Sequence, residues 1–180
     1  ATRALAAPLK VTSLTASPQG FFVTSTLVTG EKEAILIDAA FTLADAHRVV
    51  GAVLDSGKTL TTVYVTHAHP DHYFGLAVIK AAFPAAKLVA RPDVIAEMNR
   101  SWKGKVAQWG PMYGANLTSA PAIPEALTGD SLTLEGEKLE ITGSVQGDDP
   151  HNSFVWIPSA KAVVAGDVVY NGVHVWTAET

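Results

Sequence analysis

Four side chains that commonly bind metal ions lie close together in residues 67–72, which read His-Ala-His-Pro-Asp-His. The segment directly follows an apolar run that predicts a largely buried β-strand. Alternate side chains of an extended segment project to the same side, so His67 and His69 can hold one ion. Asp71 and His72 lie further along the loop and can reach a second ion. Because the ligands are nitrogens and carboxylates without a thiolate, they favour zinc, with manganese or iron as alternatives.

Two further candidate ligands lie downstream, each beside a predicted strand. His151 belongs to a turn-rich stretch before the strand at residues 154–157, and Asp167 ends the apolar strand at residues 162–167. A carboxylate at a strand end, after a glycine that lets the backbone approach closely, is well placed to bridge two cations. Alone, such an Asp is usually a turn residue, and such a His is usually a surface or core residue. Their order behind residues 67–72 makes a joint metal site the better interpretation.

This order of ligands resembles that of the metallo-β-lactamase superfamily of hydrolases, and the resemblance covers nearly the whole chain. It implies an α/β fold, the αββα sandwich of that superfamily. The strand at residues 33–38 looks like the family's early strand, which implies that Asp38 orients the histidine loop from behind the ligands. An ordinary strand-terminal Asp is the alternative. The implied ligands, for two zinc ions in the intact protein, are His67, His69 and His151 for the first metal, Asp71 and His72 for the second, and Asp167 as the bridge.

Three departures from the family pattern bear on this interpretation. Ala39-Ala40 replaces the glycine-containing pair that usually follows the early Asp, and residues 150–153 replace the usual Gly-His-Thr-Pro-Gly around the third histidine. The chain also stops thirteen residues after Asp167, where family members carry a further strand, helices and a final histidine ligand. We therefore expect a domain at residues 8–180 that lacks its C-terminal part. The apolar surface left open is expected to associate into a homo-oligomer.

Strands and helices alternate around these ligands, which indicates α/β layers in one domain. Thr42 is a suitable N-cap for the first predicted helix, and Pro92 suits the first turn of the longest one. Hydrophobic spacing and turn residues define the other boundaries. The predicted strands are residues 9–14, 21–28, 34–38, 60–65, 87–90, 131–134, 138–142, 154–157 and 162–167, and the predicted helices are residues 42–56, 73–83 and 92–108.

The expected chemistry is hydrolysis by a metal-bound hydroxide. Two divalent cations that share a water lower its pKa to about 7, so that hydroxide forms at neutral pH and attacks a polarised carbonyl group. Asp71, beside that water, is the candidate to accept its proton. Tyr170, three positions after Asp167, is similar to a tyrosine of the family's lactonases, although a packing aromatic explains it equally well. His174 and Trp176 are candidates for the rim of the same pocket.

Residue types narrow the substrate class. The absence of cysteine excludes the Cys ligand of one major group of true β-lactamases, and His69 stands where members with di-iron redox chemistry tend to have Glu. A bridging Asp is typical of members that cleave thioesters, lactones, esters or phosphodiesters. A lactone, ester or thioester hydrolase, similar to the family's lactonases and glyoxalase II, is therefore the prediction. The alternatives are a β-lactam hydrolase, a phosphodiesterase and a non-catalytic metal-binding domain.

Composition argues for one folded domain that acts on a small molecule. A length of 180 residues with 48% hydrophobic content suits a single core and argues against disorder. The net charge is −4 and the basic residues are scattered, which disfavours nucleic acid as a partner. No apolar run approaches the length of a membrane span.

The first seven residues bear on localisation. The segment Ala4-Leu5-Ala6-Ala7-Pro8 resembles the small-residue end of a secretory signal, so residues 1–7 are interpreted as the remnant of an export signal. This predicts a periplasmic or exported protein. The alternative is the edge of a cloning tag on a cytoplasmic protein.

Overall fold

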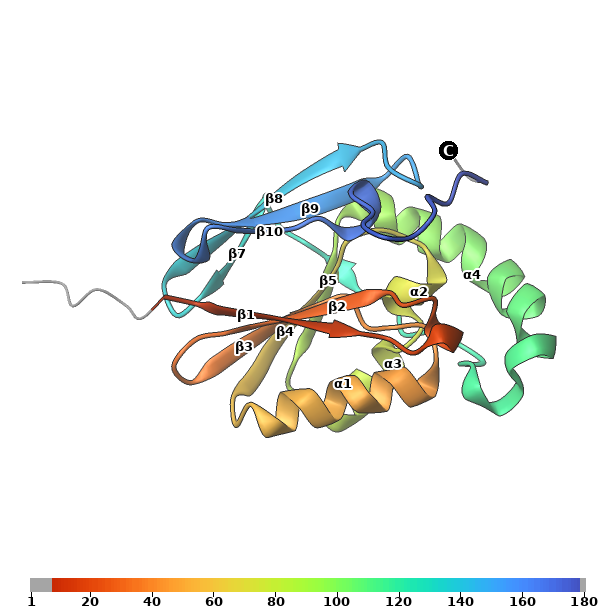
Figure 1. Cartoon of the computed structure of the whole chain (residues 1–180), viewed down its shortest axis with the longest axis horizontal. Helices are drawn as coiled ribbons and strands as arrows, with labels where there is room; N and C mark the ends of the chain where they lie inside the picture. The colour runs from red at the N-terminus through yellow and green to blue at the C-terminus, as the bar shows by residue number, and fades with distance from the viewer. Residues whose placement is uncertain (1–7, 179–180) are drawn as a thin grey trace, which may run out of the picture.

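Three layers make up the computed structural model of the chain, which describes residues 8–178 (Figure 1). Helices cover one face of a six-stranded sheet, and the other face of that sheet packs against a four-stranded sheet. The arrangement confirms the predicted α/β fold, and the two facing sheets are those of the predicted αββα sandwich. Residues 1–7, the predicted remnant of an export signal, lie outside the described residues. Among residues 8–178, no helix is both long and apolar enough to span a membrane.

The strand order is β1-β2-β3-β4-β5-β6 in the first sheet and β10-β9-β8-β7 in the second. The strands are β1 (Lys10–Thr15), β2 (Thr24–Thr29), β3 (Glu33–Ile37), β4 (Thr59–Val65), β5 (Lys87–Ala90), β6 (Glu125–Ala126), β7 (Ser131–Leu134), β8 (Glu137–Val145), β9 (Asn152–Ile157) and β10 (Ala162–Val164). The helices are α1 (Leu43–Asp55), α2 (Pro70–Tyr73), α3 (Leu76–Ala82) and α4 (Pro92–Tyr113), with short 3-10 turns η1 (Pro18–Gly20), η2 (Gly114–Asn116), η3 (Pro158–Ala160) and η4 (Gly166–Val168).

Strand direction in the first sheet brings chemistry-bearing residues to one edge. Strands β3, β4 and β5 are parallel neighbours, paired in the register Ile37↔Tyr64 and Val65↔Ala90. The residues that follow parallel strands meet at the same edge of a sheet. Asp38 after β3 therefore lies beside the loop after β4, which begins at Thr66 and carries the histidines.

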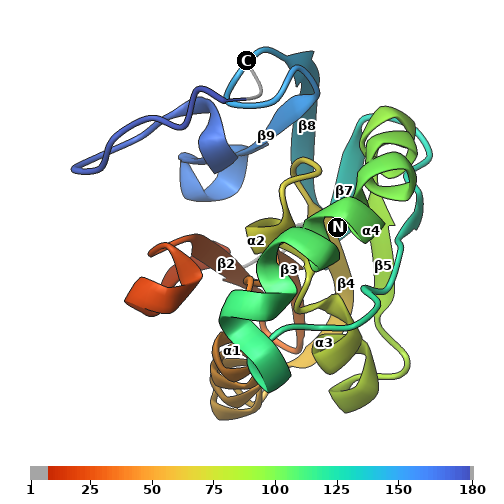
Figure 2. The same cartoon turned by 90° about the vertical axis from the view of Figure 1, so that its right-hand side faces the viewer.

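The second sheet brings two more segments to the same edge. Strands β9 and β10 pair antiparallel with Val155 opposite Val164, so the turn before β9 lies beside the residues after β10. Figure 2 looks onto this edge. Helix α2 lies where the two sheets end, with α4 on one side and the β1–β2 turn and the segment after β10 on the other. The loops of both sheets can thus contribute to one site.

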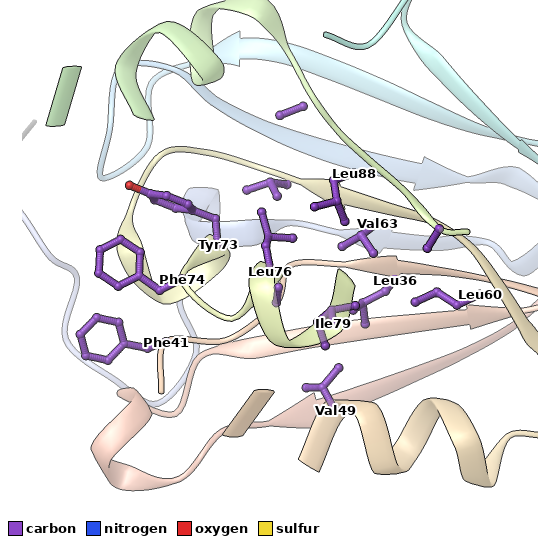
Figure 3. Packing of buried hydrophobic residues seen from close by; sticks show 14 of the residues in the cluster. Leu36, Phe41, Val49, Leu60, Val63, Tyr73, Phe74, Leu76, Ile79 and Leu88 are labelled. Atoms are coloured by element: carbon purple, nitrogen blue, oxygen red, sulfur yellow. The ribbon is translucent and has the colours of Figure 1, made fainter. Parts of the chain in front are cut away.

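Two apolar clusters hold the layers together, one on each face of the first sheet. Leu36 and Val63 point toward the helices, whereas Ile35, Ile37 and Tyr64 point toward the second sheet. Burying each Leu or Ile side chain contributes about 1.5–3 kcal/mol relative to exposure. Burial on both faces explains why the strands beside the site are continuous apolar runs. On the helix side the large buried side chains are Phe41, Val49, Tyr73, Phe74, Leu76 and Ile79 (Figure 3).

Some predicted boundaries differ from the structure. The strand predicted at residues 21–28 begins at Thr24, because Phe21 and Phe22 form a turn with φ of 60° and 59°. The helix predicted at residues 73–83 is divided into α2 and α3, with Gly75 between them. The predicted N-cap of α1 is confirmed, since Thr42 Oγ1 accepts a hydrogen bond from the Asp45 amide at 3.0 Å.

Gly75 lets the helix that carries His72 pack closely on the segment after β3. Its amide donates to the Ala40 carbonyl at 3.0 Å, and a methyl group at its Cα would overlap the Ala39 carbonyl oxygen. We predict that Gly75→Ala lowers the free energy of unfolding by about 3 kcal/mol, since backbone must shift to relieve the overlap. Urea denaturation measures this.

The matched control is Gly51→Ala in α1, where an added methyl meets no heavy atom within 4 Å. Because alanine favours helix over glycine, this variant is expected to gain about 0.5–1 kcal/mol. Equal stability of the two variants would contradict the packing role of Gly75.

Candidate metal centre

Asp38 holds the loop that carries the histidines. Its side chain is 1% exposed, and its backbone has a left-handed φ of 63°. The carboxylate accepts hydrogen bonds from the amide and the hydroxyl of Thr66, both at 2.9 Å, and from His72 Nδ1 at 2.8 Å. The loop after β4 is therefore anchored at two points by a residue of the neighbouring strand.

These contacts determine which ring nitrogen atoms of His67 and His72 remain available to coordinate a metal ion. The single hydroxyl proton of Thr66 goes to Asp38, so Thr66 Oγ1 accepts the proton of His67 Nδ1 at 3.0 Å. His72 Nδ1 donates to Asp38 in the same way. When the rings are neutral, the lone pairs therefore lie on the two Nε2 atoms. Both Nε2 atoms are buried, and neither has a hydrogen-bond partner among the described residues.

The first ligand group consists of His67, His69 and Asp148, all buried. Their ligand atoms lie within 4.8 Å of one another. Asp148 places Oδ1 3.6 Å from His67 Nε2 and Oδ2 2.8 Å from His69 Nδ1. The set of two imidazoles and one carboxylate matches known sites for zinc and for iron, with coordination positions left for water or substrate.

The second ligand group consists of His67, His72 and Asp167, again with ligand atoms within 4.8 Å of one another. His72 Nε2 lies 3.4 Å from Asp167 Oδ1 and 3.9 Å from Asp71 Oδ2. Asp71 lies next to this group, and its side chain lines a cavity. Asp167 belongs to η4, just beyond β10, rather than to the strand itself as predicted.

The structure places His151, the predicted third ligand of the first metal, outside both ligand groups. Its side chain is 43% exposed, and its Nδ1 lies 3.0 Å from Ser144 Oγ. The reason is the compact turn before β9. The His151 amide donates to Asp149 Oδ1 at 2.7 Å, and Asn152 Nδ2 donates to Asp148 Oδ1 at 3.1 Å. This turn directs Asp148 inward and His151 outward.

Sequence reasoning missed Asp148, although a signal for it was present. Gly147-Asp148 before β9 repeats the Gly166-Asp167 pair after β10. Both glycines permit close approach: a Cβ at Gly147 would lie 2.9 Å from the Asp167 carbonyl oxygen, and one at Gly166 would lie 3.0 Å from Thr66 Oγ1. The two carboxylates therefore enter the site from adjacent strand ends, and in each case the preceding glycine allows the close approach.

The charges of the site shift the pKa values of His67 and His72 in opposite directions. Burial disfavours the charged form of both rings. For His67, the charges of the other two histidines add to burial, and its pKa lies well below the ordinary value. For His72, the carboxylates of Asp167, Asp38 and Asp71 outweigh burial and raise the pKa well above the ordinary value. His67 is thus a neutral ligand near pH 7, whereas a metal ion at His72 has to displace a proton.

Tyr170 connects the two ligand groups. Its hydroxyl oxygen lies 2.9 Å from Asp148 Oδ2 and 2.8 Å from Asp167 Oδ2, and it can donate its single proton to either carboxylate. Burial and the neighbouring negative charge of Asp167 raise the pKa of Tyr170 far above its ordinary value. The phenol is therefore a hydrogen-bond donor at neutral pH.

A cavity of about 240 Å³ opens over the ligands. One part of its wall is aromatic: the Phe21 ring lies 5.5 Å from that of Trp109 and 5.2 Å from that of Phe41. The turn that carries Phe21 is fixed by Asp45, which accepts hydrogen bonds from the amide and hydroxyl of Ser17. The cavity is lined by His69, Pro70, Asp71, Lys105, Gln108, Trp109, Asp148, Asp167, Tyr170 and Val173, together with Phe21 and the two predicted rim residues, His174 and Trp176.

A family model described as the metallo-beta-lactamase superfamily matches residues 18–179. The chain belongs to the metallo-β-lactamase superfamily. The match covers both ligand groups and every strand except β1, in agreement with the resemblance of the histidine segment. Hydrolase chemistry and metal binding are general properties of this superfamily.

Two known proteins match the chain over shorter stretches. The uncharacterized protein YobT of Bacillus subtilis (strain 168) is 40% identical over 80 residues, 44% of this chain and 34% of that protein. A hydroxyacylglutathione hydrolase of Albidiferax ferrireducens is 39% identical over 56 residues, 31% of this chain and 20% of that protein. The chain thus matches only about a third and a fifth of the lengths of these relatives.

A solved structure of the superfamily shares the fold. The crystal structure of BLEG-1, a B3 metallo-beta-lactamase, superposes with a TM-score of 0.69. The match covers 90% of this chain and 74% of that one. At 17% sequence identity, this likeness concerns the fold alone.

We predict that Asp148, and not His151, is needed for metal binding in this member of the superfamily. Asp148→Ala and His67→Ala should each weaken zinc binding at the first group by at least about 100-fold, since even partners behind a ligand typically contribute 10–100-fold. His151→Ala should keep the zinc content of the unaltered chain. Zinc per chain after dialysis, measured by mass spectrometry, decides between them. Zinc loss in the His151 variant with full zinc in the Asp148 variant would reverse the assignment.

Proposed function

We propose that the chain is a metal-dependent hydrolase of a carbonyl substrate, namely a lactone, an ester or a thioester. The observation that supports this most is that members of both ligand groups line one cavity, namely His69 and Asp148 of the first group and Asp167 of the second. Its volume of about 240 Å³ is near the lower end for ligand pockets, which suits a small molecule. Zinc is the preferred metal, two ions are expected, and manganese or iron are the alternatives.

The donor atoms of the site fit a bound cation. A buried nitrogen atom without a hydrogen bond is costly, and neither His67 Nε2 nor His72 Nε2 makes one with the described residues, although each faces a carboxylate. Asp148 and Asp167 supply carboxylate oxygens within 3.6 Å of these nitrogen atoms. A cation among these atoms would satisfy both nitrogens and neutralise the carboxylates. We assign His67, His69 and Asp148 to a first ion, and His72, Asp71 and Asp167 to a second.

Bound divalent cations supply an activated water at neutral pH and polarise the substrate carbonyl. Asp71 is placed to accept the proton of the attacking water, because its carboxylate lines the cavity beside His72. Burial, together with the charge of Asp167, raises the pKa of Asp71 against the opposing charge of His72. A raised pKa makes a carboxylate a better proton acceptor near pH 7. Tyr170 can donate a hydrogen bond to the oxygen on which negative charge develops.

Two features of the chain favour a carbonyl substrate over the alternatives. The described residues that line the cavity include the aromatic Phe21, Trp109 and Trp176 but a single lysine, Lys105, and no arginine, which disfavours a phosphodiester. The similarity to a protein named hydroxyacylglutathione hydrolase supports acyl-glutathione among the thioesters to be assayed. A β-lactam hydrolase, a phosphodiesterase and a non-catalytic metal-binding domain are the other outcomes of the assay. A periplasmic location and a homo-oligomer stay predictions.

Hydrolysis should depend on metal. We predict that a panel of lactone, ester and thioester substrates contains at least one that the zinc-loaded chain hydrolyses, and that chelation lowers the rate by at least about 100-fold. His69→Ala should abolish the activity, whereas His47→Ala, at an exposed position of α1, should not change it. A chromogenic cephalosporin and bis(p-nitrophenyl) phosphate complete the panel. Equal rates with zinc and after chelation would contradict the proposal.

Tyr170 should affect turnover rather than metal binding. We predict that Tyr170→Phe retains the zinc content of the unaltered chain and lowers kcat about 10- to 100-fold, because one hydrogen bond to the developing oxyanion is lost. Zinc content and steady-state kinetics are measured on the same preparation. An unchanged kcat, or a loss of zinc, would show that the tyrosine serves to position Asp148 and Asp167 instead.

A further inference from the structure

Asp45, in the first turn of α1, is a buried acidic residue outside the two ligand groups. It is 2% exposed, and its carboxylate accepts hydrogen bonds from the amide of Ser17 at 3.0 Å and from the hydroxyl of Ser17 at 2.8 Å. The β1–β2 turn packs closely on it, since a Cβ at Gly20 would lie 2.5 Å from Asp45 Oδ2. An acidic residue in a first turn suits the helix dipole, but that interaction requires neither burial nor a partner in a distant turn.

The turn that Asp45 contacts has a strained backbone. Phe21 and Phe22, directly after η1, have φ of 60° and 59°, a left-handed conformation that residues other than glycine rarely adopt. Strain of this kind persists only where surrounding contacts hold the segment in place. Here the contacts come from two helices: Asp45 of α1 accepts from the start of the turn, and the Tyr113 hydroxyl of α4 donates to the Gln19 carbonyl at 2.9 Å.

This conformation places the Phe21 ring in the wall of the cavity over the metal ligands. The ring packs 5.5 Å from that of Trp109, yet Phe21 is 44% exposed and keeps a free apolar surface. If the turn relaxed, the ring would leave the wall, whereas the metal ligands belong to other loops and would stay. Asp45 can therefore influence ligand binding without contact with the ligand or the metal.

The contact between Asp45 and Ser17 depends on the charge of the carboxylate. Burial raises the pKa of Asp45, but the hydrogen bonds from Ser17 and Thr42 outweigh burial and lower it below the ordinary value. The group is thus ionised at neutral pH, and hydrogen bonds to an ionised acceptor are the stronger kind. An asparagine has nearly the same shape, but its NH₂ group cannot accept a hydrogen bond, so one acceptor oxygen is lost.

We propose that Asp45 is a positioning residue, which holds Ser17 and thereby keeps Phe21 in the cavity wall. It then sets how tightly the chain binds the apolar part of a ligand whose polar part coordinates the metal. That this ligand is the substrate rests on the proposed hydrolase function, whereas the positioning of the wall does not.

The test compares the binding of acetohydroxamate and benzohydroxamate to the zinc-loaded chain by isothermal titration calorimetry. Both carry the same metal-coordinating group, with a methyl group on one and a phenyl group on the other. Benzohydroxamate should bind at least about tenfold more tightly, because its ring is buried against the wall. Asp45→Asn and Phe21→Ala should each reduce this preference to less than about threefold. Asp55→Asn, at an exposed position of the same helix, is the matched control and should leave it unchanged.

A double variant distinguishes positioning from a general loss of structure. If Asp45 acts through Phe21, adding Asp45→Asn to Phe21→Ala should cause no further loss of the preference, whereas independent effects would add. Ser17→Ala removes one of the two hydrogen bonds and leaves α1 unaltered, so it should cause a smaller loss in the same direction. Zinc content and the thermal midpoint show whether each variant is folded, and Ser17→Ala decides the question if Asp45→Asn is not.

Three results would overturn the proposal: equal or absent binding of the two hydroxamates by the unaltered chain, a preference that survives both Asp45→Asn and Ser17→Ala, or additive losses in the double variant. The hydrolase function is tested separately with the substrate panel. A preference that depends on Asp45, without hydrolysis of any substrate, supports the positioning role and refutes the hydrolase. Hydrolysis together with a preference that does not depend on Asp45 supports the hydrolase and refutes the positioning role.

Discussion

The site depends on one buried carboxylate, that of Asp38. It lies behind the ligands rather than among them, and its hydrogen bonds to Thr66 and His72 fix both the loop and the ring that follows it. Thr66 in turn fixes the ring of His67. Because an unpaired buried carboxylate is costly, any rearrangement of the loop has to break these bonds together. The ligands are therefore held in place by the fold itself.

Charge balance is the second constraint on this edge of the sheets. Asp71, Asp148 and Asp167 are gathered against three imidazole rings in surroundings of low dielectric constant. Negative charge at such density is unfavourable unless protons or cations accompany it. The raised pKa of His72 and the hydroxyl of Tyr170 between two carboxylates are both responses to that surplus. The same surplus favours divalent cations.

The fold and the site could be predicted from the sequence wherever the signal is local or periodic. Continuous apolar strands, the Thr42 cap and the histidine segment lead directly to the fold and to the edge at which the site lies. The sequence did not predict the positions of residues whose conformation is set by tertiary contacts. Phe21 leaves its predicted strand because aromatic neighbours hold it in a turn. His151 turns outward because side-chain hydrogen bonds shape the turn before β9. A lysine on a helix usually indicates a surface position, so the burial of Lys105 follows only from the packing of α4.

His67 belongs to both ligand groups but has one nitrogen to offer, since its Nδ1 is engaged with Thr66. One lone pair coordinates one cation. Cations at the two groups would therefore not be held alike: an ion bound by His67 Nε2 would have His69 and Asp148 as its other protein ligands. An ion at the second group would rely on Asp71, Asp167 and His72, and the raised pKa of His72 means that its ring would first have to lose a proton. Metal binding at the second group is consequently expected to weaken more than at the first as the pH falls.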